Sequence, residues 1–338
     1  MNRPFHRKQK RDLAFFLEGI SQKNKFVLAE AITLVESSTT DDKILSEQLL
    51  TWVYDQKAPS SMRIAVTGSP GSGKSTFIDY LGSSLANVGH HVAVLTIDPS
   101  SSTSKGSILG DKTRMETLLG MDNVFVRPSP SGNILGGVAP HTKEAILLCE
   151  AAGFDRILIE TVGVGQSEVE VSYLTDVNVF ILQPGAGDDL QGIKRGILEN
   201  MDIVVVNKSD GTQKDLAKET ANYYGQSFSL FHHPMVDWKI PVHLVSSLEK
   251  IGLSDVLLSL DRFEQLAKSK GTWTFKRRQQ EIKWFQKMIP TLLLKWAYTH
   301  PSFTVEINQI EKELSQEEIH AVMALREVEK SIQKIFGI

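Results

Sequence analysis

An eight-residue run, Gly68-Ser69-Pro70-Gly71-Ser72-Gly73-Lys74-Ser75, constrains the fold of this chain more than any other feature. It follows the apolar run 64–66 and precedes residues 76–81, a segment typical of a helix. This order of strand, glycine-rich loop and helix is the signature of a phosphate-binding loop. Its three glycines let the backbone approach anionic oxygens that a Cβ atom would keep away. The run therefore predicts an α/β domain with a phosphate site where its first strand ends.

The residue types within this loop predict how it would hold a nucleoside triphosphate. Backbone amides between Gly68 and Thr76 would point at the β-phosphate, aided by the positive end of the helix dipole. Lys74 would place its charge beside the β- and γ-phosphate oxygens. The Ser75 hydroxyl would be a ligand of Mg²⁺.

A second motif, Asn207-Lys208-Ser209-Asp210, follows the apolar run 202–206 and indicates which base is bound. Asp210 can accept hydrogen bonds from the N1–H and the exocyclic amino group of guanine. Adenine offers neither donor in that geometry and would leave the carboxylate unpaired. The stem of Lys208 would lie on the base, and Asn207 would connect the two loops.

A further apolar run at 242–245 leads into Ser246, Ser247 and Leu248. We expect these three residues to supply backbone contacts to the guanine O6 atom. The alternative is an ordinary turn between a strand and a helix.

Apolar runs alternate with helical patterns between residue 62 and about residue 268. Strands covered on both faces of a parallel sheet are apolar along nearly their whole length, and these runs have that character. The sequence therefore predicts an α/β fold with a mainly parallel sheet flanked by helices. Its expected strands are 62–67, 91–97, 123–127, 156–160, 177–183, 202–206 and 242–245.

Helical periodicity marks both ends of the chain and divides it into three expected parts. These are an N-terminal helical segment at 1–58, a phosphate-binding-loop domain at 59–270 and a C-terminal helical arm at 271–338. The pattern from Ser315 to Glu318 predicts a capping box that opens a final helix. The arm is too small to bury its own apolar faces, so we expect it to pack on the main domain or, in a homodimer, on a second copy.

The net charge and the cysteine content bound the class of protein. A formal charge of −3 gives no broad cationic face, so we expect no nucleic-acid partner. The single cysteine, Cys149, excludes an intrachain disulfide and lies in an apolar helical run, where we expect it to fill the core. We find no segment apolar enough to cross a bilayer and expect no membrane association. The sequence favours a cytoplasmic protein of bacterial type, while its basic N-terminus leaves an organellar transit peptide open.

Two loops after predicted strands carry residues suited to the γ-phosphate. A long polar loop from Asp98 to Asp111 is a candidate Mg²⁺-sensing segment. Glu160 ends its strand with a carboxylate that suits Mg²⁺ coordination, and Gly163 can present its amide to the γ-phosphate. The alternatives are a helix cap at Asp98 and a capped strand at Glu160.

The residue that follows this glycine predicts the rate of hydrolysis. In small regulatory GTPases a glutamine at that position orients the attacking water. Here Val164 occupies the position and Gln166 lies two residues further on, so we expect slow intrinsic hydrolysis that a partner accelerates. A third glycine-rich stretch, 183–195, is expected to face a partner, the alternative being a plain loop at the rim of the site.

These loops resemble the methylmalonyl-CoA mutase-associated GTPases of the MeaB and MMAA type. The resemblance extends from Ala31 to about residue 270 and is carried by the runs 98–101, 106–115, 127–132, 135–139, 148–154, 160–168 and 184–188. It implies a GTPase that uses GTP, GDP and Mg²⁺ and that dimerises through its C-terminal helices. It also implies a chaperone that gates adenosylcobalamin loading onto a B12-dependent acyl-CoA mutase and protects that enzyme.

The resemblance assigns roles to residues by their position. The set expected to contact Mg²⁺ and phosphate is Lys74, Asp98, Asp111 and Glu160. Asp188 and Lys194 would belong to a switch loop that signals to the mutase. Lys105 stands where the family usually has glycine, and Pro140-His141 also departs from its pattern. These departures concern the mobility of the first loop and not nucleotide binding.

Two other function classes remain open at this point. A metal-delivery GTPase of the nickel-enzyme maturation type would need a cysteine and histidine cluster, and only His90-His91 and His232-His233 are paired in the sequence. A small-molecule kinase linked to amino-acid transport would need an acceptor pocket, for which we find no pattern. Which acyl-CoA mutase is served, and whether a cobalamin adenosyltransferase is a further partner, also stays open.

Overall fold

The computed structural model describes residues 11–37, 39–56, 60–98, 115–130, 141–161, 170–185, 200–229 and 233–336. The chain forms two compact units, Met1–Arg277 and Arg278–Ile338. Within the described ranges, no helix combines the length and the apolar character that crossing a membrane requires.

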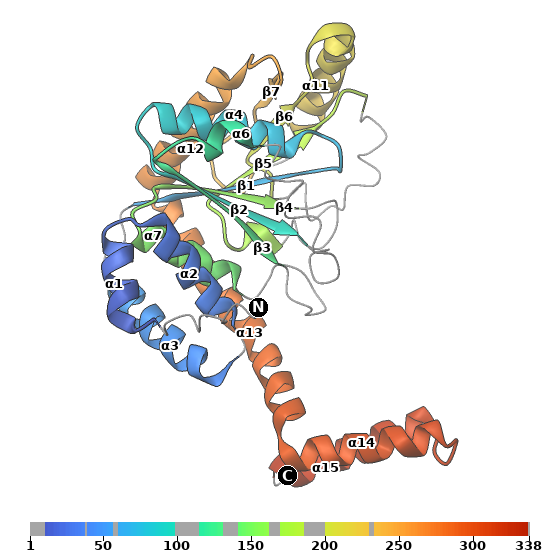
Figure 1. The fold of residues 1–338 in the computed structure, drawn as a ribbon. Helices are drawn as coiled ribbons and strands as arrows, with labels where there is room; N and C mark the ends of the chain where they lie inside the picture. The colour runs from blue at the N-terminus through green and yellow to red at the C-terminus, as the bar shows by residue number, and fades with distance from the viewer. Residues whose placement is uncertain are drawn as a thin grey trace, which may run out of the picture. The chain divides into compact units, whose positions relative to one another are not determined.

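The first unit is built on a seven-stranded sheet in which all described strand pairs are parallel. The strands lie in the order β3-β2-β4-β1-β5-β6-β7 (Figure 1). Their bounds are β1 Met62–Gly68, β2 Val92–Asp98, β3 Val124–Pro130, β4 Arg156–Thr161, β5 Val177–Leu182, β6 Ile203–Val206 and β7 Val242–Leu244. Each begins within one residue of the start of a predicted run, so the predicted fold class is confirmed.

Helices cover both faces of this sheet. α4 (Lys74–Asn87), α6 (Glu116–Leu119) and α12 (Leu253–Ser269) share one apolar core with alternate residues of the strands. The intervening residues of β5 and β6 pack against α11 (Lys214–Ser229) on the other face. Figure 1 shows α7 (Thr142–Ala151) on the side of β2 and β4 away from α4. β1 lies between β4 and β5, so its carboxyl end is central, the position where such sheets bind ligands.

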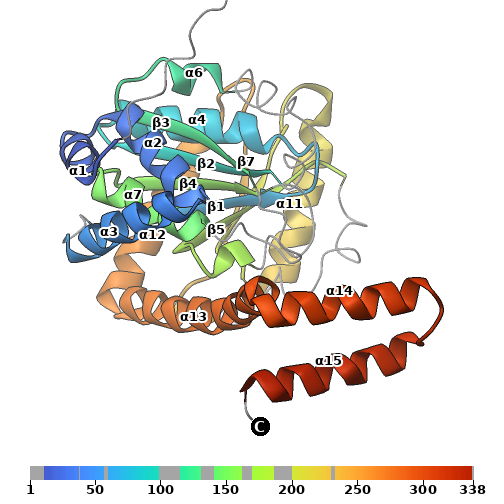
Figure 2. The same ribbon diagram turned by 60° about the horizontal axis from the view of Figure 1, so that its bottom comes forward.

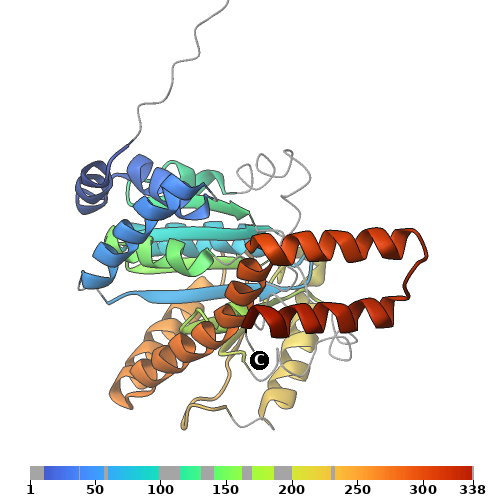
Figure 3. The ribbon, with the colours of Figure 1, turned by 90° about the horizontal axis from the view of Figure 1, so that it is seen from below.

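The N-terminal segment forms three helices, α1 (Leu13–Ser21), α2 (Lys25–Glu36) and α3 (Thr40–Asp55). Each begins after a polar residue whose side chain accepts a backbone N–H of the first turn, namely Asp12, Asn24 and Thr39. α2 and α3 contact α7 (Figure 3). Arg127 of β3 lies 2.7 Å from the Glu36 carboxylate and so joins the segment to the sheet edge.

A buried network of ion pairs occupies the amino edge of the sheet. The Arg63 guanidinium of β1 donates to both oxygens of Glu150 at 2.8 Å. Burial alone would raise the pKa of Glu150, but the hydrogen bonds and charge of Arg63 outweigh it and lower this pKa. Arg277, near the start of α13 (Thr272–Thr299), pairs with Asp176 at 2.7 Å. Asp176 also accepts the Arg63 N–H at 2.8 Å, so the network fastens the start of α13 to β1.

The second unit contains the remainder of α13 and two antiparallel helices, α14 (Pro301–Ser315) and α15 (Ala321–Phe336), which contact each other (Figure 2). The predicted capping box is wrong. Ser315 is the last residue of α14, its hydroxyl donates to the Lys312 carbonyl, and α15 begins only at Ala321. Glu317, with a φ of 59°, turns the chain between the two helices.

Candidate nucleotide site

The first motif forms a tight loop between β1 and α4, and close backbone contacts explain two of its glycines. Gly68 has a φ of +149°, and a Cβ there would lie 2.2 Å from the Ile181 carbonyl oxygen. Gly73, the N-cap of α4, has a φ of +87°, and its Cβ would lie 2.5 Å from the Asn207 amide nitrogen. A side chain at either position would force the loop open, so the sheet and the second motif together set its shape.

Lys74 and Ser75 are buried at the start of α4. The Lys74 ammonium donates to the carbonyl oxygens of Gly68 and Ser69 at 2.9 and 3.1 Å. The Ser75 hydroxyl donates to Glu160 Oε1, at the end of β4, at 2.7 Å. These two oxygen groups are of the kind that Mg²⁺ prefers. The buried Ser72 Oγ has no hydrogen-bond partner in the described part of the chain, so the loop holds an unpaired polar atom.

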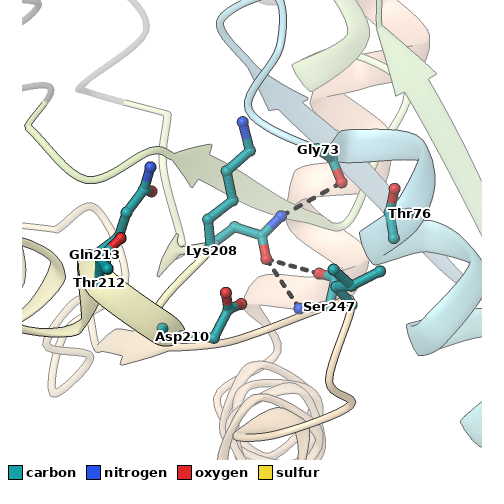
Figure 4. A pocket seen from close by; sticks show the side chains of 10 residues that line it. Gly73, Thr76, Lys208, Asp210, Thr212, Gln213 and Ser247 are labelled. Carbon is teal, nitrogen blue, oxygen red and sulfur yellow. Dashed lines mark hydrogen bonds between the residues drawn. The ribbon is translucent and has the colours of Figure 1, made fainter.

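Asn207 follows β6 and joins three loops through one side chain that is 2% exposed. Its Nδ2 donates to the Ser72 carbonyl at 2.9 Å. Its Oδ1 accepts from the backbone N–H and the hydroxyl of Ser247 at 3.1 and 2.8 Å (Figure 4). The phosphate loop, the second motif and the loop after β7 are therefore held together; the sequence predicted the link between the first two, and the bonds to Ser247 add the third.

A cavity of about 430 Å³ opens between these loops, within the size range of small-molecule pockets. Figure 4 shows Asp210 and Lys208 on one side of it and Thr76 and Ser247 on the other. Asp210 accepts a hydrogen bond from the Ser246 hydroxyl, which fixes the orientation of its carboxylate. The other lining residues are Gly73, Asn207, Gly211, Thr212, Gln213 and Leu248.

Three residues were predicted to contact the guanine O6 atom, and among them Leu248 is the one whose backbone N–H can donate to a ligand. The Ser246 N–H donates to the Ile251 carbonyl at 3.1 Å, and the Ser247 N–H is held by Asn207. The Leu248 N–H makes no hydrogen bond within the described residues, and Leu248 lines the cavity with 80% of its surface exposed.

The remaining predicted residues are placed to different extents. Ser69, Pro70 and Gly71 lie in the loop between β1 and α4. Asp98 is the last residue of β2, and only its backbone is described. Five positions lie outside the described residues, so their roles stay predictions: Asp111, Gly163, Gln166, Asp188 and Lys194.

Sequence reasoning missed three residues that line this cavity, Gly211, Thr212 and Gln213, and one outside its lining, Tyr80. Thr212 and Gln213 line it from the short helix η1 (Gly211–Gln213), and their position directly after Asp210 was a usable signal. Tyr80, inside α4, donates its hydroxyl to the Lys250 carbonyl at 2.5 Å. No sequence pattern marks that tyrosine.

Glu144, near the start of α7, is an ionisable group with a strongly shifted pKa. Burial raises the pKa of its carboxyl to about 7, while a backbone hydrogen bond and the charge of Lys143 act weakly in the opposite direction. Its Oε2 atom is buried and has no hydrogen-bond partner among the described residues. Burial therefore favours the neutral form of this side chain.

The chain is similar to known proteins both in sequence and in structure. The profile of a family described as "Methylmalonyl Co-A mutase-associated GTPase MeaB" matches residues 28–302. The GTPase ArgK of Escherichia coli K12 is 36% identical over 321 residues, which cover 95% of this chain and 97% of that protein. A mouse protein, "Methylmalonic aciduria type A homolog, mitochondrial", is 40% identical over 91% of this chain and 76% of its own length. The crystal structure of an LAO/AO transport system kinase matches with a TM-score of 0.73 and 31% identity, over 95% of this chain and 97% of that one.

Proposed function

The chain belongs to the family of methylmalonyl Co-A mutase-associated GTPases and is itself a GTPase, and we propose that it is a chaperone of a B12-dependent acyl-CoA mutase. In this proposal it gates adenosylcobalamin loading onto an enzyme of the methylmalonyl-CoA mutase type and protects that enzyme from inactivation. Binding and hydrolysis of GTP would change the loop conformations that the mutase recognises. A cobalamin adenosyltransferase is a further candidate partner.

The cavity beside the phosphate loop is the observation that supports a guanine nucleotide. Asp210, oriented by Ser246, would accept the N1–H and the amino group of guanine, and the Leu248 N–H would donate to O6. Adenine reverses the donor and acceptor at these positions, so both protein groups would lose their partners. Lys208 also lines the cavity and would lie against the base.

Ser75 and Glu160 would hold Mg²⁺, with Asp98 and Asp111 as further proposed ligands. The contact of 2.7 Å between the Ser75 hydroxyl and the Glu160 carboxylate brings two suitable oxygen donors together. When bound, Mg²⁺ would neutralise negative charge on the β- and γ-phosphates. The chain itself contributes Lys74. Its ammonium would give up its hydrogen bonds to the Gly68 and Ser69 carbonyls and donate to phosphate oxygens instead.

Slow hydrolysis with partner stimulation is the proposed kinetic behaviour. Val164, which lacks a polar side chain, stands where a water-orienting glutamine is expected, directly after Gly163. We propose that the bound mutase completes the site, with Gln166 nearby and with Asp188 and Lys194 in the loop that responds to the partner.

The C-terminal arm, residues 271–338, is the proposed homodimer interface. Large apolar side chains are exposed along its three helices, among them Phe285, Leu292, Leu293, Leu294, Tyr298, Val305, Val322 and Leu325. Pairing with a second copy would remove such surface from water.

Reconstitution of cofactor transfer tests the proposed function. Purified chain, a methylmalonyl-CoA mutase and adenosylcobalamin should give a loading rate that differs between GTP and GDP, and the mutase should accelerate GTP hydrolysis. Lys74→Ala should abolish the nucleotide dependence, whereas alanine at the exposed Lys214 should preserve it. Loading that is indifferent to the chain in every nucleotide state would contradict the proposal.

The same preparation tests the two alternatives. Stoichiometric Ni²⁺ or Zn²⁺ binding would favour a metal-delivery GTPase, although no group of three metal-ligating side chains occurs among the described residues. Phosphate on arginine or ornithine in place of free phosphate would favour a kinase.

A further inference from the structure

The loop after β7 is a turn closed by three hydrogen bonds that involve Ser246. Ser246 and Ile251 exchange two backbone hydrogen bonds at 3.1 and 3.0 Å, and the Glu249 N–H donates to Ser246 Oγ at 3.1 Å. Lys250, inside this turn, has a φ of +57°, a left-handed conformation that is unfavourable for a residue with a side chain. An additional contact at Lys250 would stabilise this conformation.

Tyr80 supplies that contact from α4, the helix that begins with the phosphate-loop lysine. Its hydroxyl donates to the Lys250 carbonyl at 2.5 Å, although the two residues are 170 positions apart. Its ring packs against the apolar core beneath α4, which limits the movement of the hydroxyl. The Tyr80 hydroxyl is a protonated donor at neutral pH, as for any tyrosine, and burial raises its pKa further.

The amide of Leu248 lies between two fixed points of this turn. Ser247, directly before it, is held by Asn207, and Lys250, two residues after it, is held by Tyr80. We propose that Tyr80 is a positioning residue for guanine specificity, because it holds the Leu248 N–H where the guanine O6 arrives. This inference rests on the proposed reading of guanine by Asp210 and Leu248, and it adds a residue that no nucleotide-binding motif of the chain contains.

Tyr80→Phe tests the inference because it removes only the hydroxyl. Dissociation constants are measured by calorimetry, with Mg²⁺, for GDP, for 6-thio-GDP, in which sulfur replaces O6, and for IDP, which lacks the amino group. The variant should bind GDP about three- to tenfold more weakly, the loss expected for one hydrogen bond. The preference for GDP over 6-thio-GDP should shrink by a similar factor. The preference for GDP over IDP should stay unchanged, since both bases keep O6.

Tyr54→Phe is the matched control, because Tyr54 is 86% exposed at the end of α3 and should leave all three constants unchanged. A Tyr80→Phe variant that binds GDP like the wild type would overturn the inference. So would a variant that loses the same factor with all three nucleotides, which is the result of general damage to α4. A wild-type chain that binds GDP and ADP equally would overturn the proposed guanine recognition, and the role of Tyr80 with it.

Discussion

Replacing Asn207 by alanine should separate the loops that this side chain joins. The substitution removes three hydrogen bonds of ordinary length, one to the Ser72 carbonyl and two from Ser247, and a long one of 3.5 Å to the Gly73 carbonyl. Each bond contributes about 1 kcal/mol net, and partners left unpaired in a buried site cost more. A total of about 2–3 kcal/mol would weaken GDP binding about 30- to 150-fold, because the separated loops must be reassembled by the nucleotide.

Calorimetric titration with GDP and Mg²⁺ measures this loss directly. Asn178→Ala is the matched control: Asn178 is also a buried asparagine, and its Nδ2 donates to the Asn200 carbonyl at 2.7 Å at the amino end of β5. It should lower the melting temperature without changing the dissociation constant. The reasoning fails if Asn207→Ala binds GDP within threefold of the wild type, or if the control loses affinity to the same extent.

Three further substitutions have defined outcomes. Gly73→Ala should weaken GDP binding at least tenfold, because at a φ of +87° the added methyl group would lie 2.5 Å from the Asn207 side chain. Gly89→Ala is the control: it also has a positive φ, +99°, but open space around it, so it should lower only the melting temperature. A Gly73→Ala variant that binds GDP as tightly as the wild type would refute the clash. Asp210→Asn should shift the preference from GDP towards xanthosine diphosphate, since the asparagine N–H₂ can donate to the C2 carbonyl of xanthine. Competition binding measures the shift, and a retained preference for guanine contradicts it. In the wild-type protein, folding raises the pKa of Glu144 from 4.5 to about 7, so its contribution to stability is fully present below pH 4.5 and is lost as pH rises through 7. Glutamine does not ionise, so Glu144→Gln should raise the free energy of unfolding by about 2 kcal/mol more at pH 8 than at pH 5. Melting curves measure this difference, and parallel pH profiles of the two proteins would rule it out.

The parts of the fold that could be predicted are those specified by neighbouring residues. The central strands β1, β5 and β6 are buried along their whole length because both faces of the sheet are covered there, and apolar runs located all seven strand starts to within one residue. The two nucleotide motifs lie at strand ends because a parallel sheet brings those ends to one edge. The role of Asn207 as a connector also followed from the motif.

The parts that could not be predicted depend on contacts between distant residues. Nothing in the sequence around Tyr80 or Lys250 indicates that they meet across 170 positions. The error at Ser315 has a local cause, because serine followed three residues later by glutamate also occurs where a helix ends. Pro301 at the first position of α14 was the stronger signal for a helix start, since proline is favoured there.

The position of β1 has a mechanical consequence. At one end, the Arg63 N–H donates to the Asp176 carboxylate, the Asp176 N–H donates to the Arg63 carbonyl, and the same carboxylate pairs with Arg277 of α13. At the other end, the strand becomes the phosphate loop at Gly68. β4 and β5 are hydrogen-bonded along its two sides, so β1 resists bending and stretching. A force on α13 that reaches Arg277 would therefore act, through β1, on the loop that begins at Gly68.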